Sequence, residues 1–492
     1  MSQELFIRGI VSLIVGITVF LMIDYRYDEE MKQKTDENKH QRYVPYISVG
    51  FLIGGLLGKV ILSLLSGGSE TAIHLLISLC FELFLHISLY YMVLLFVLPI
   101  FRKRINARIC AAMWMVPNFL YVLLNGTSPL RKPIGIIAIP KNFVEVIFYI
   151  WLFGFGVVLL RGLLEHWAFR SELLKDTKKA EDEEILELWN NELKSANMRY
   201  TKYPLLISKK IKTPLSIGMN PSHICVLLPE REYSLEELRL IFRHEIIHIG
   251  REDTWNKFMI LFCTAMCWFN PLMWIAMRKS AEDLELSCDE TVLLGMNEKS
   301  KRQYAELILN TVGDERGFTT CLSSSAKALK YRLENIIKPN RKNPGTLTLA
   351  VVLFVLCMSF GHISLAYGEY SGKEIVYGEK NTKFYELDSM YLLEEDTNTT
   401  IVKCKDIETF HKYIAGLNLQ KMTGNYSFDY IGKKLKFVYE SADGSRYVEL
   451  TDDTIRILAL DEDAKDWSSY YLSEKVDWEY LETLIFPVVE SD

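Results

Sequence analysis

Two histidines and a glutamate fall within five residues of this chain, at His244, Glu245 and His248. An α-helix turns by about 100° per residue, so side chains four apart share a face, and two imidazole nitrogens on one face bind one Zn²⁺. Glu245 then lies beside the open position of the metal, where a carboxylate acts as general base on a bound water. The pattern predicts a zinc hydrolase with ligands His244 and His248 and catalytic Glu245.

The residues around this motif predict the helix that presents it. Ser234 followed three residues later by Glu237 is typical of a capping box, and Gly250 suits a helix C-cap. We therefore expect a helix over residues 235–249 with the motif in its last two turns. The alternative is a buried amphipathic helix whose histidines only form hydrogen bonds. With nine histidines in 492 residues, chance produces the motif in roughly one such chain in a hundred.

A catalytic zinc takes a third protein ligand and keeps its fourth position for water. The acidic stretch 282–290 offers several candidates. Within it Glu285 and Asp289 are four apart and share a helix face, so that Glu285 reaches the metal while Asp289 accepts the second ring N–H of a zinc-bound histidine. Glu282 and Glu290 compete for the role of third ligand. Cys288 is rotated away from Glu285, and we expect it to pack in the core.

A set of motifs over residues 200–365 resembles the bacterial membrane zinc metallopeptidases typified by the β-lactam sensor-transducers, the antirepressor regulatory peptidases. The matching stretches are 244–248, 251–253, 269–272, 285–289, 304–306 and 331–336. Members of that family couple an external sensor to a cytosolic zinc peptidase that triggers loss of a transcriptional repressor. The resemblance implies Zn²⁺ bound by His244, His248 and Glu285, with Glu245 as base and Asp289 in contact with a ligand.

The chain also departs from that family. The β-lactam sensors end in a large penicillin-binding domain with a Ser-x-x-Lys nucleophile, whereas 126 residues follow Ala366 here. The one Ser-x-x-Lys sequence begins at Ser324, before the last predicted membrane span, and no Lys-Thr-Gly follows it. Acylation by β-lactams therefore has no support, and the external ligand is unassigned.

Hydrophobic residues make up 49 % of the chain and are concentrated in blocks. Five blocks approach the roughly 20 apolar residues that a membrane span requires. They are 5–23, 44–65, 73–100, 109–124 and 143–163, and a sixth follows at 347–365. We expect a transmembrane bundle over 1–163, a cytosolic, mainly helical, gluzincin-type peptidase domain over 164–342, a last span over 343–366 and an extracellular domain over 367–492.

Basic loops predict the orientation in the cell membrane. Loop 102–108 is strongly basic and should be cytosolic, while loop 66–70 has no basic residue and should lie outside. The N-terminus is then outside, the peptidase domain inside and the C-terminal domain outside, although Arg131 and Lys132 fall on the outer side. The apolar run 255–277 contains Asn270-Pro271, which breaks a helix, so we expect it to lie against or dip into the cytoplasmic face.

Residues 367–492 carry 14 basic and 26 acidic side chains, a net charge of −12. Alternating patterns predict strands at 434–440, 447–450 and 454–460, a turn at 442–445 and a closing helix at 476–486. We expect a small α+β module that binds or interacts rather than catalyses, without a disulfide because Cys404 is its one cysteine.

These observations predict a membrane zinc endopeptidase that responds to an external stimulus. Its expected substrate is a cytosolic winged-helix repressor or the chain itself, cut near Cys321, Leu322 and Ser323 in the small polar stretch 319–325. That stretch is alternatively an ordinary interhelix loop. A quality-control peptidase and a non-proteolytic sensor that keeps zinc for structure are the competing functions. A homodimer is one possible oligomeric state of this chain. The overall charge of −6 and the lack of a DNA-binding motif give no support for direct nucleic-acid binding.

Overall fold

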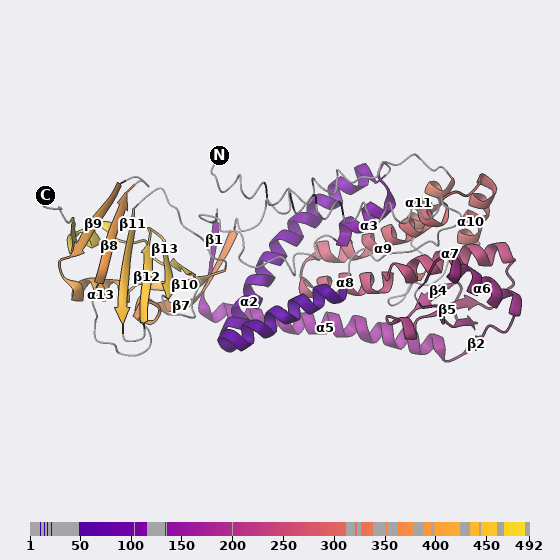
Figure 1. Cartoon of the computed structure of the whole chain (residues 1–492), viewed down its shortest axis with the longest axis horizontal. Helices are drawn as coiled ribbons and strands as arrows, with labels where there is room; N and C mark the ends of the chain where they lie inside the picture. The colour runs from indigo at the N-terminus through magenta and orange to yellow at the C-terminus, as the bar shows by residue number, and fades with distance from the viewer. Residues whose placement is uncertain are drawn as a thin grey trace. The chain divides into compact units, whose positions relative to one another are not determined.

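The computed structural model in Figure 1 describes much of the chain, and the described residues fall in two compact units. It describes residues 10, 14, 17, 21, 49–102, 104–115, 133, 135–198, 200–310, 320–321, 326–337, 351, 363–377, 387–394, 398–423, 433–441, 444–459 and 467–487. The first unit comprises residues 1–59, 83–123 and 152–358, and the second comprises residues 60–82, 124–151 and 359–492.

Two helical segments of the described chain, Thr71–Phe101 and Phe143–Leu174, are long and apolar enough to cross a membrane. The first belongs to α2 (Val49–Phe101), which is interrupted at Gly68, where φ is 71° and ψ is −166°. The second belongs to α5 (Lys141–Leu174), which exposes large apolar side chains such as Phe153. An apolar helix surface without protein cover fits a lipid environment. The predicted spans 5–23 and 347–365 lie largely outside the described residues.

The described part of the predicted span 109–124 has a different environment. Helix α3 (Ala107–Met115) packs against α9 (Pro271–Val292), and Ile109 and Trp114 are both 2 % exposed. A helix that is buried by protein and a helix that is buried by lipid carry the same apolar composition. Residues 116–124 lie outside the described residues, so the predicted span over 109–124 stays a prediction.

The first unit holds a five-stranded sheet and a set of helices. In its described residues the strand order is β2-β3-β5-β4-β6, with β3 and β5 parallel and the other neighbours antiparallel. The strands are β2 (Thr177–Lys179), β3 (Leu205–Ser208), β4 (Leu215–Ile217), β5 (Cys225–Pro229) and β6 (Thr320–Cys321). The helices are α6 (Glu183–Ser195), α7 (Leu235–Gly250), α8 (Asp253–Met266), α9, α10 (Glu298–Asn310) and α11 (Ala326–Ile337). Helix α7 contacts β4, α6, α8, α9 and α10 and so lies at the centre of this unit.

The apolar run 255–277 is divided between two helices. Helix α8 ends at Met266, and α9 begins at Pro271 after Asn270, whose side chain accepts a hydrogen bond from the Leu272 N–H at 3.0 Å. The break falls at the Asn-Pro pair that the sequence indicated, because proline suits the first turn of a helix. Neither half of the run reaches spanning length by itself.

The second unit is built on a ten-stranded sheet. Among its described residues the order is β1-β7-β10-β14-β13-β12-β11-β8-β9-β15. The strands are β1 (Gly135–Ile139), β7 (Ile363–Ser371), β8 (Leu387–Glu394), β9 (Asn398–Cys404), β10 (Asn418–Met422), β11 (Lys434–Ser441), β12 (Gly444–Leu450), β13 (Thr454–Ala459), β14 (Ser468–Leu472) and β15 (Ile485–Pro487). Helices α13 (Ile407–Ala415) and α14 (Trp478–Leu484) accompany the sheet, with a π-helical turn η3 (Lys373–Tyr377). The predicted strands correspond to β11, β12 and β13.

Three boundaries in the second unit differ from the sequence prediction. The expected last span 343–366 overlaps β7, which begins at Ile363 and pairs in parallel with β1. The expected helix 476–486 is shorter, because Ile485 and Phe486 belong to β15 and pair with β9. Strand β1 itself was not expected. In each case partners distant in sequence decide the structure of a short apolar stretch, and local pattern does not reveal them.

Candidate metal centre

The motif helix begins where the sequence indicates. The Ser234 side chain accepts the Glu237 N–H at 3.3 Å, and the Glu237 carboxylate accepts the Ser234 N–H at 2.9 Å, which completes the capping box. Helix α7 ends one residue later than expected, with Gly250 as its last residue and Arg251 as the C-cap. The two histidines therefore lie in the final turns of a helix that is fixed at both ends.

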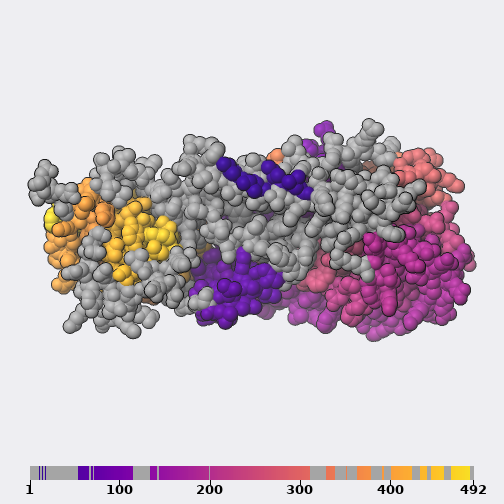
Figure 2. Space-filling model, in the orientation of Figure 1, coloured from indigo at the N-terminus to yellow at the C-terminus, as the bar shows by residue number. Residues whose placement is uncertain are grey.

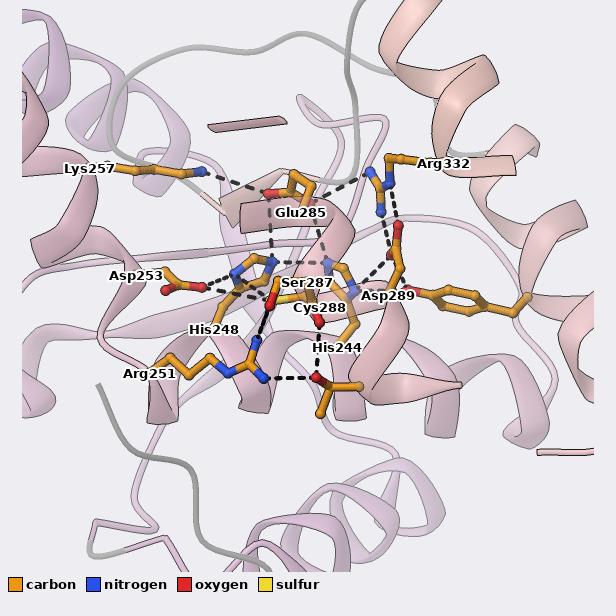
Figure 3. Close-up of polar contacts among 12 residues, drawn as sticks. His244, His248, Arg251, Asp253, Lys257, Glu285, Ser287, Cys288, Asp289 and Arg332 are labelled. Atoms are coloured by element: carbon orange, nitrogen blue, oxygen red, sulfur yellow. Dashed lines mark hydrogen bonds and ion pairs between the residues drawn. The ribbon is translucent and has the colours of Figure 1, made fainter. Parts of the chain in front are cut away.

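Three side chains direct ligand atoms toward one point (Figure 3). The Nε2 atoms of His244 and His248 are 3.0 Å apart, and they lie 3.5 Å and 3.6 Å from the Glu285 carboxylate oxygens. Tetrahedral zinc with bonds of 2.0–2.1 Å separates neighbouring ligand atoms by about 3.3 Å. Two imidazoles and a carboxylate are also a donor set that catalytic zinc uses. The arrangement can therefore hold one Zn²⁺ with little rearrangement.

The competing carboxylates are engaged elsewhere. Glu282 forms an ion pair with Lys279 at 2.7 Å, and Glu290 accepts the Ala107 N–H at 2.9 Å. Of the three glutamates that the sequence left open, Glu285 is the one whose carboxylate lies beside both histidines. The Cys288 sulfur lies 3.3 Å from Nδ1 of His248, on the opposite side of that ring from the ligand atoms, and is fully buried.

Each histidine is oriented through its second ring nitrogen. His248 Nδ1 lies 2.7 Å from Asp253 Oδ2, and His244 Nδ1 lies 2.8 Å from the Tyr304 hydroxyl. That hydroxyl donates to Asp289 Oδ1 at 2.7 Å, so the hydroxyl accepts the His244 Nδ1–H. An Nδ1–H held in this way leaves the Nε2 lone pair directed at the metal position.

We expected Asp289 to accept a hydrogen bond directly from a histidine. Instead, the Tyr304 hydroxyl bridges Asp289 and His244. Asp289 Oδ1 is 3.6 Å from His244 Nδ1, beyond hydrogen-bond range, because the Tyr304 hydroxyl lies between them. No role for Tyr304 or Asp253 was predicted from the sequence. Asp253 follows the motif by five residues and begins α8, so only the sharp turn between α7 and α8 returns it to His248.

Arg332 contacts two of the acidic residues of α9, Asp289 and Glu285. Its Nε and Nη2 donate to the two Asp289 carboxylate oxygens at 2.6 Å and 2.7 Å, and its Nη1 lies 3.6 Å from Glu285 Oε2. The guanidinium is 2 % exposed. A bidentate arginine fixes the plane of a carboxylate, so Arg332 holds Asp289 and limits the movement of Glu285.

The charge state of the site suits a cation. Burial by itself raises the pKa of Glu285, but the neighbouring His248 and the Lys257 ammonium, 3.8 Å away, outweigh it and hold that pKa well below its usual range. Glu285 is therefore an ionised carboxylate, which is the form that binds a metal.

Hydrogen bonds of Arg251 also connect the C-terminal end of α7 to α9. Arg251 Nη1 donates to Ser287 Oγ at 3.0 Å, and its Nη2 donates to Thr291 Oγ1 at 2.8 Å. These bonds fix the end of the motif helix against the helix that carries Glu285. In the face shown in Figure 2, side chains of this unit, in magenta and salmon, pack into a continuous surface. The candidate ligands themselves are buried, since Glu285 is 4 % exposed and His244 is fully buried.

A cavity of about 440 Å³ adjoins the end of the motif helix. Tyr203, Met219 and Trp255 give it an apolar lining, and His248 forms part of its wall. Asn197 and Glu252, with φ of 48° and 57°, are the two non-glycine residues of the described chain with positive φ, and both line it. Strained backbone concentrates at functional sites, so this cavity is a candidate subsite for an apolar substrate side chain.

The predicted self-cleavage region is only partly described. Cys321 lies in β6, which pairs antiparallel with β4 through Leu215↔Cys321 and Ser216↔Thr320. Thr320 and Cys321 are therefore extended, in a strand at the edge of the sheet, and do not form the ordinary interhelix loop that was the alternative. Leu322 and Ser323 lie outside the described residues.

Together, the capped His-Glu-x-x-His helix and the glutamate on a following helix are consistent with the zinc site of a metallopeptidase. Residues 128–336 match the family described as BlaR1 peptidase M56. This region of the chain belongs to the BlaR1-type peptidase M56 family.

The chain is also similar to curated regulators. Regulatory protein BlaR1 of Bacillus licheniformis is 25 % identical over 223 residues, which cover 44 % of this chain and 37 % of that protein. Methicillin resistance mecR1 protein of Staphylococcus aureus is 27 % identical over 237 residues, covering 44 % and 38 %. Regulatory protein BlaR1 of Staphylococcus aureus is 28 % identical over 130 residues, covering 25 % and 22 %. The chain thus spans less than two fifths of the length of these relatives.

Proposed function

We propose that this protein is a membrane zinc endopeptidase that transmits an external stimulus by cleaving a cytosolic transcriptional repressor, its own chain, or both. The observation that carries the proposal is the convergence of the His244 and His248 Nε2 atoms and the Glu285 carboxylate at 3.0–3.6 Å, with the buried Glu245 on the same helix as the two histidines. The names of the relatives, which are regulatory and resistance proteins, favour a regulatory substrate over general degradation.

The chemistry follows from the side chains around the ligand point. A zinc ion held by His244, His248 and Glu285 would supply Lewis acidity. Glu245, which follows His244 on the same helix, would act as general base, taking a proton from the attacking water and giving it to the departing amine. Asp253 and Tyr304 keep both imidazoles in the tautomer that faces the metal, and Arg332 keeps the α9 carboxylates in place.

The β4–β6 pairing supports self-cleavage. Peptidases bind substrates as extended strands, and residues 320–321 already lie in that conformation on β4, the strand that contacts the motif helix. A segment tethered in the same chain has a high effective concentration. We infer that residues 321–323 are a substrate of the chain's own metal centre.

The β1–β7 pairing supports the proposed topology. Strands that share hydrogen bonds lie on the same side of a membrane, so residues 135–139 and 363–371 share one side. Helix α5 follows β1 directly and leads toward the peptidase unit. We infer that β1 and the C-terminal domain lie outside and the peptidase unit in the cytosol. A membrane-impermeant label should reach cysteines introduced at the exposed Glu408 but not at Glu181; labelling of Glu181 in intact cells would contradict this topology.

Glu245→Gln tests the enzymatic proposal in the full-length protein. The amide keeps the shape of the side chain but cannot accept a proton, so zinc content should be unchanged while cleavage falls at least about 10²-fold. The readouts are zinc per chain and fragments of the chain or of a co-expressed repressor, identified by N-terminal sequencing. Undiminished cleavage with equal zinc would remove Glu245 from the mechanism.

A further inference from the structure

The residue that follows the first membrane-length helix is half-buried against α9, the helix that carries Glu285. Arg102 comes directly after Phe101, the last residue of α2, and its Nη2 forms an ion pair with Asp283 Oδ1 on α9. The Arg102 side chain is 16 % exposed and that of Asp283 only 1 %. Such a pair is costly to bury, so it joins the two elements firmly only while both partners remain in place.

Further contacts reach the same part of α9. The Trp114 indole N–H of α3 donates to Asp283 Oδ2 at 2.7 Å, and the Ala107 N–H donates to Glu290 Oε2 at 2.9 Å. Segment 102–114 therefore holds α9 at two places, Asp283 and Glu290, and Glu285 lies between them on the same helix.

Arg102 also contacts α11, the helix that carries Arg332, whose guanidinium lies near Glu285. The Arg102 guanidinium lies over the Tyr331 ring of α11, 4.5 Å from its centroid. Tyr331 immediately precedes Arg332, which binds Asp289 and lies 3.6 Å from Glu285. One guanidinium at the end of a membrane helix thus contacts both elements that set the position of the third ligand.

We propose that Arg102 and Asp283 are positioning residues that fix the zinc ligand Glu285 from the membrane boundary, so that a displacement at the end of α2 changes the metal centre. The inference rests on the proposed zinc-peptidase function and adds a route for its regulation. Asp283 and Glu285 are two residues apart, about 3 Å along a rigid helix axis, so a shift at one is passed to the other.

The test replaces the pair by apolar residues of similar volume, Arg102→Met together with Asp283→Leu. Uncharged replacements of a buried ion pair are often neutral for stability, so the thermal unfolding midpoint should stay close to wild type. Zinc release to a chelator from the full-length, detergent-solubilised protein should become about tenfold faster, as for other lost supports of metal ligands. The kcat of cleavage should fall with little change in KM.

The matched control is Lys301→Met with Glu298→Leu, which removes the 2.8 Å ion pair on α10. It should release zinc at the wild-type rate. Wild-type zinc release and kcat in the Arg102/Asp283 double variant would overturn the proposal. If that variant does not fold, Arg102→Gln with Asp283→Asn decides, because it replaces the same ion pair by uncharged polar side chains of similar shape. A zinc release rate unchanged in that second double variant would then overturn the proposal.

Zinc release is measured without proteolysis, so the two proposals fail separately. Full cleavage in Glu245→Gln would refute the peptidase mechanism, whatever the zinc release rates are. Normal zinc release in the double variant would refute the positioning role, whatever Glu245→Gln does.

Discussion

Each unit of this protein contains a buried histidine that is hydrogen-bonded to a tyrosine, and the two pairs have different surroundings. In the first unit His244 Nδ1 lies 2.8 Å from the Tyr304 hydroxyl, and in the second His411 Nδ1 lies 2.7 Å from the Tyr377 hydroxyl. The hydroxyl of Tyr304 continues to Asp289 and Arg332. The described ring neighbours of His411 are instead aromatic, with Phe410 and Tyr439 beside it.

The difference indicates what distinguishes a packed histidine from a candidate metal ligand. Burial alone lowers the pKa of His411 to about 4, so that imidazole is neutral and fills an aromatic core. Around His244, a second imidazole and a carboxylate face the free ring nitrogen, while the bonded nitrogen leads to charged groups. The hydrogen bond to tyrosine is common to both sites. The charges beyond it distinguish them.

Removing each histidine should give the largest contrast. His244→Ala takes away a ligand, so we expect loss of stoichiometric zinc and of cleavage, with Glu285→Ala behaving alike. His411→Ala should keep full zinc and instead destabilise the second unit by about 2–4 kcal/mol through a core cavity. Metal analysis and thermal unfolding of the full-length variants measure both effects. Zinc loss in His411→Ala would mean that the two sites are not independent.

Removing each tyrosine hydroxyl should give a smaller contrast. Tyr304→Phe leaves the Nδ1–H of His244 without its acceptor, and we expect zinc affinity to fall about 10–100-fold. Tyr377→Phe should leave zinc affinity unchanged and cost the second unit about 1 kcal/mol for one lost hydrogen bond. Competition with a chromophoric chelator gives the affinities. Equal affinities in Tyr304→Phe and wild type would exclude a role of the hydroxyl in holding the ligand.

A further contrast is a pH dependence that we expect in the second unit. His411 titrates near pH 4 when folded and near pH 6.5 when unfolded, so between these values the unfolded chain binds the extra proton. Stability should therefore fall by about 1–3 kcal/mol as the pH drops from 6.5 to 4. Hydrogen exchange of α13, corrected for intrinsic rates, reports this, and His411→Phe should flatten the dependence. The same slope in His411→Phe would assign it to another group.

Local sequence predicted the parts of the site that depend on local contacts. The capping box at Ser234 and the four-residue spacing of the histidines require only helix geometry, and the structure has both. The roles of Tyr304 and Asp253 depend on how α10 and α8 pack on α7, which no periodicity in the sequence encodes. The burial of Arg102 illustrates the same limit, since a basic loop residue predicts a cytosolic position but not a buried partner on α9.

Fold prediction failed where short apolar stretches find distant partners. The Gly135–Ile139 segment lies between two strongly hydrophobic blocks and has too few residues to show a strand pattern of its own. Only its pairing with Ile363–Tyr367 makes it a strand. The apolar composition of α3 likewise fits a lipid or a protein environment equally well.

The parallel pairing of β1 with β7 has a consequence for the products of self-cleavage. A cut within 321–323 would separate β1, on the N-terminal fragment, from β7, on the C-terminal fragment. Five residue pairs, from Gly135↔Ile363 to Ile139↔Tyr367, would still join the two pieces. The hydrogen bonds of the sheet would then hold the two fragments together without a covalent link, so the fragments should migrate together in a native gel and separate only in denaturant.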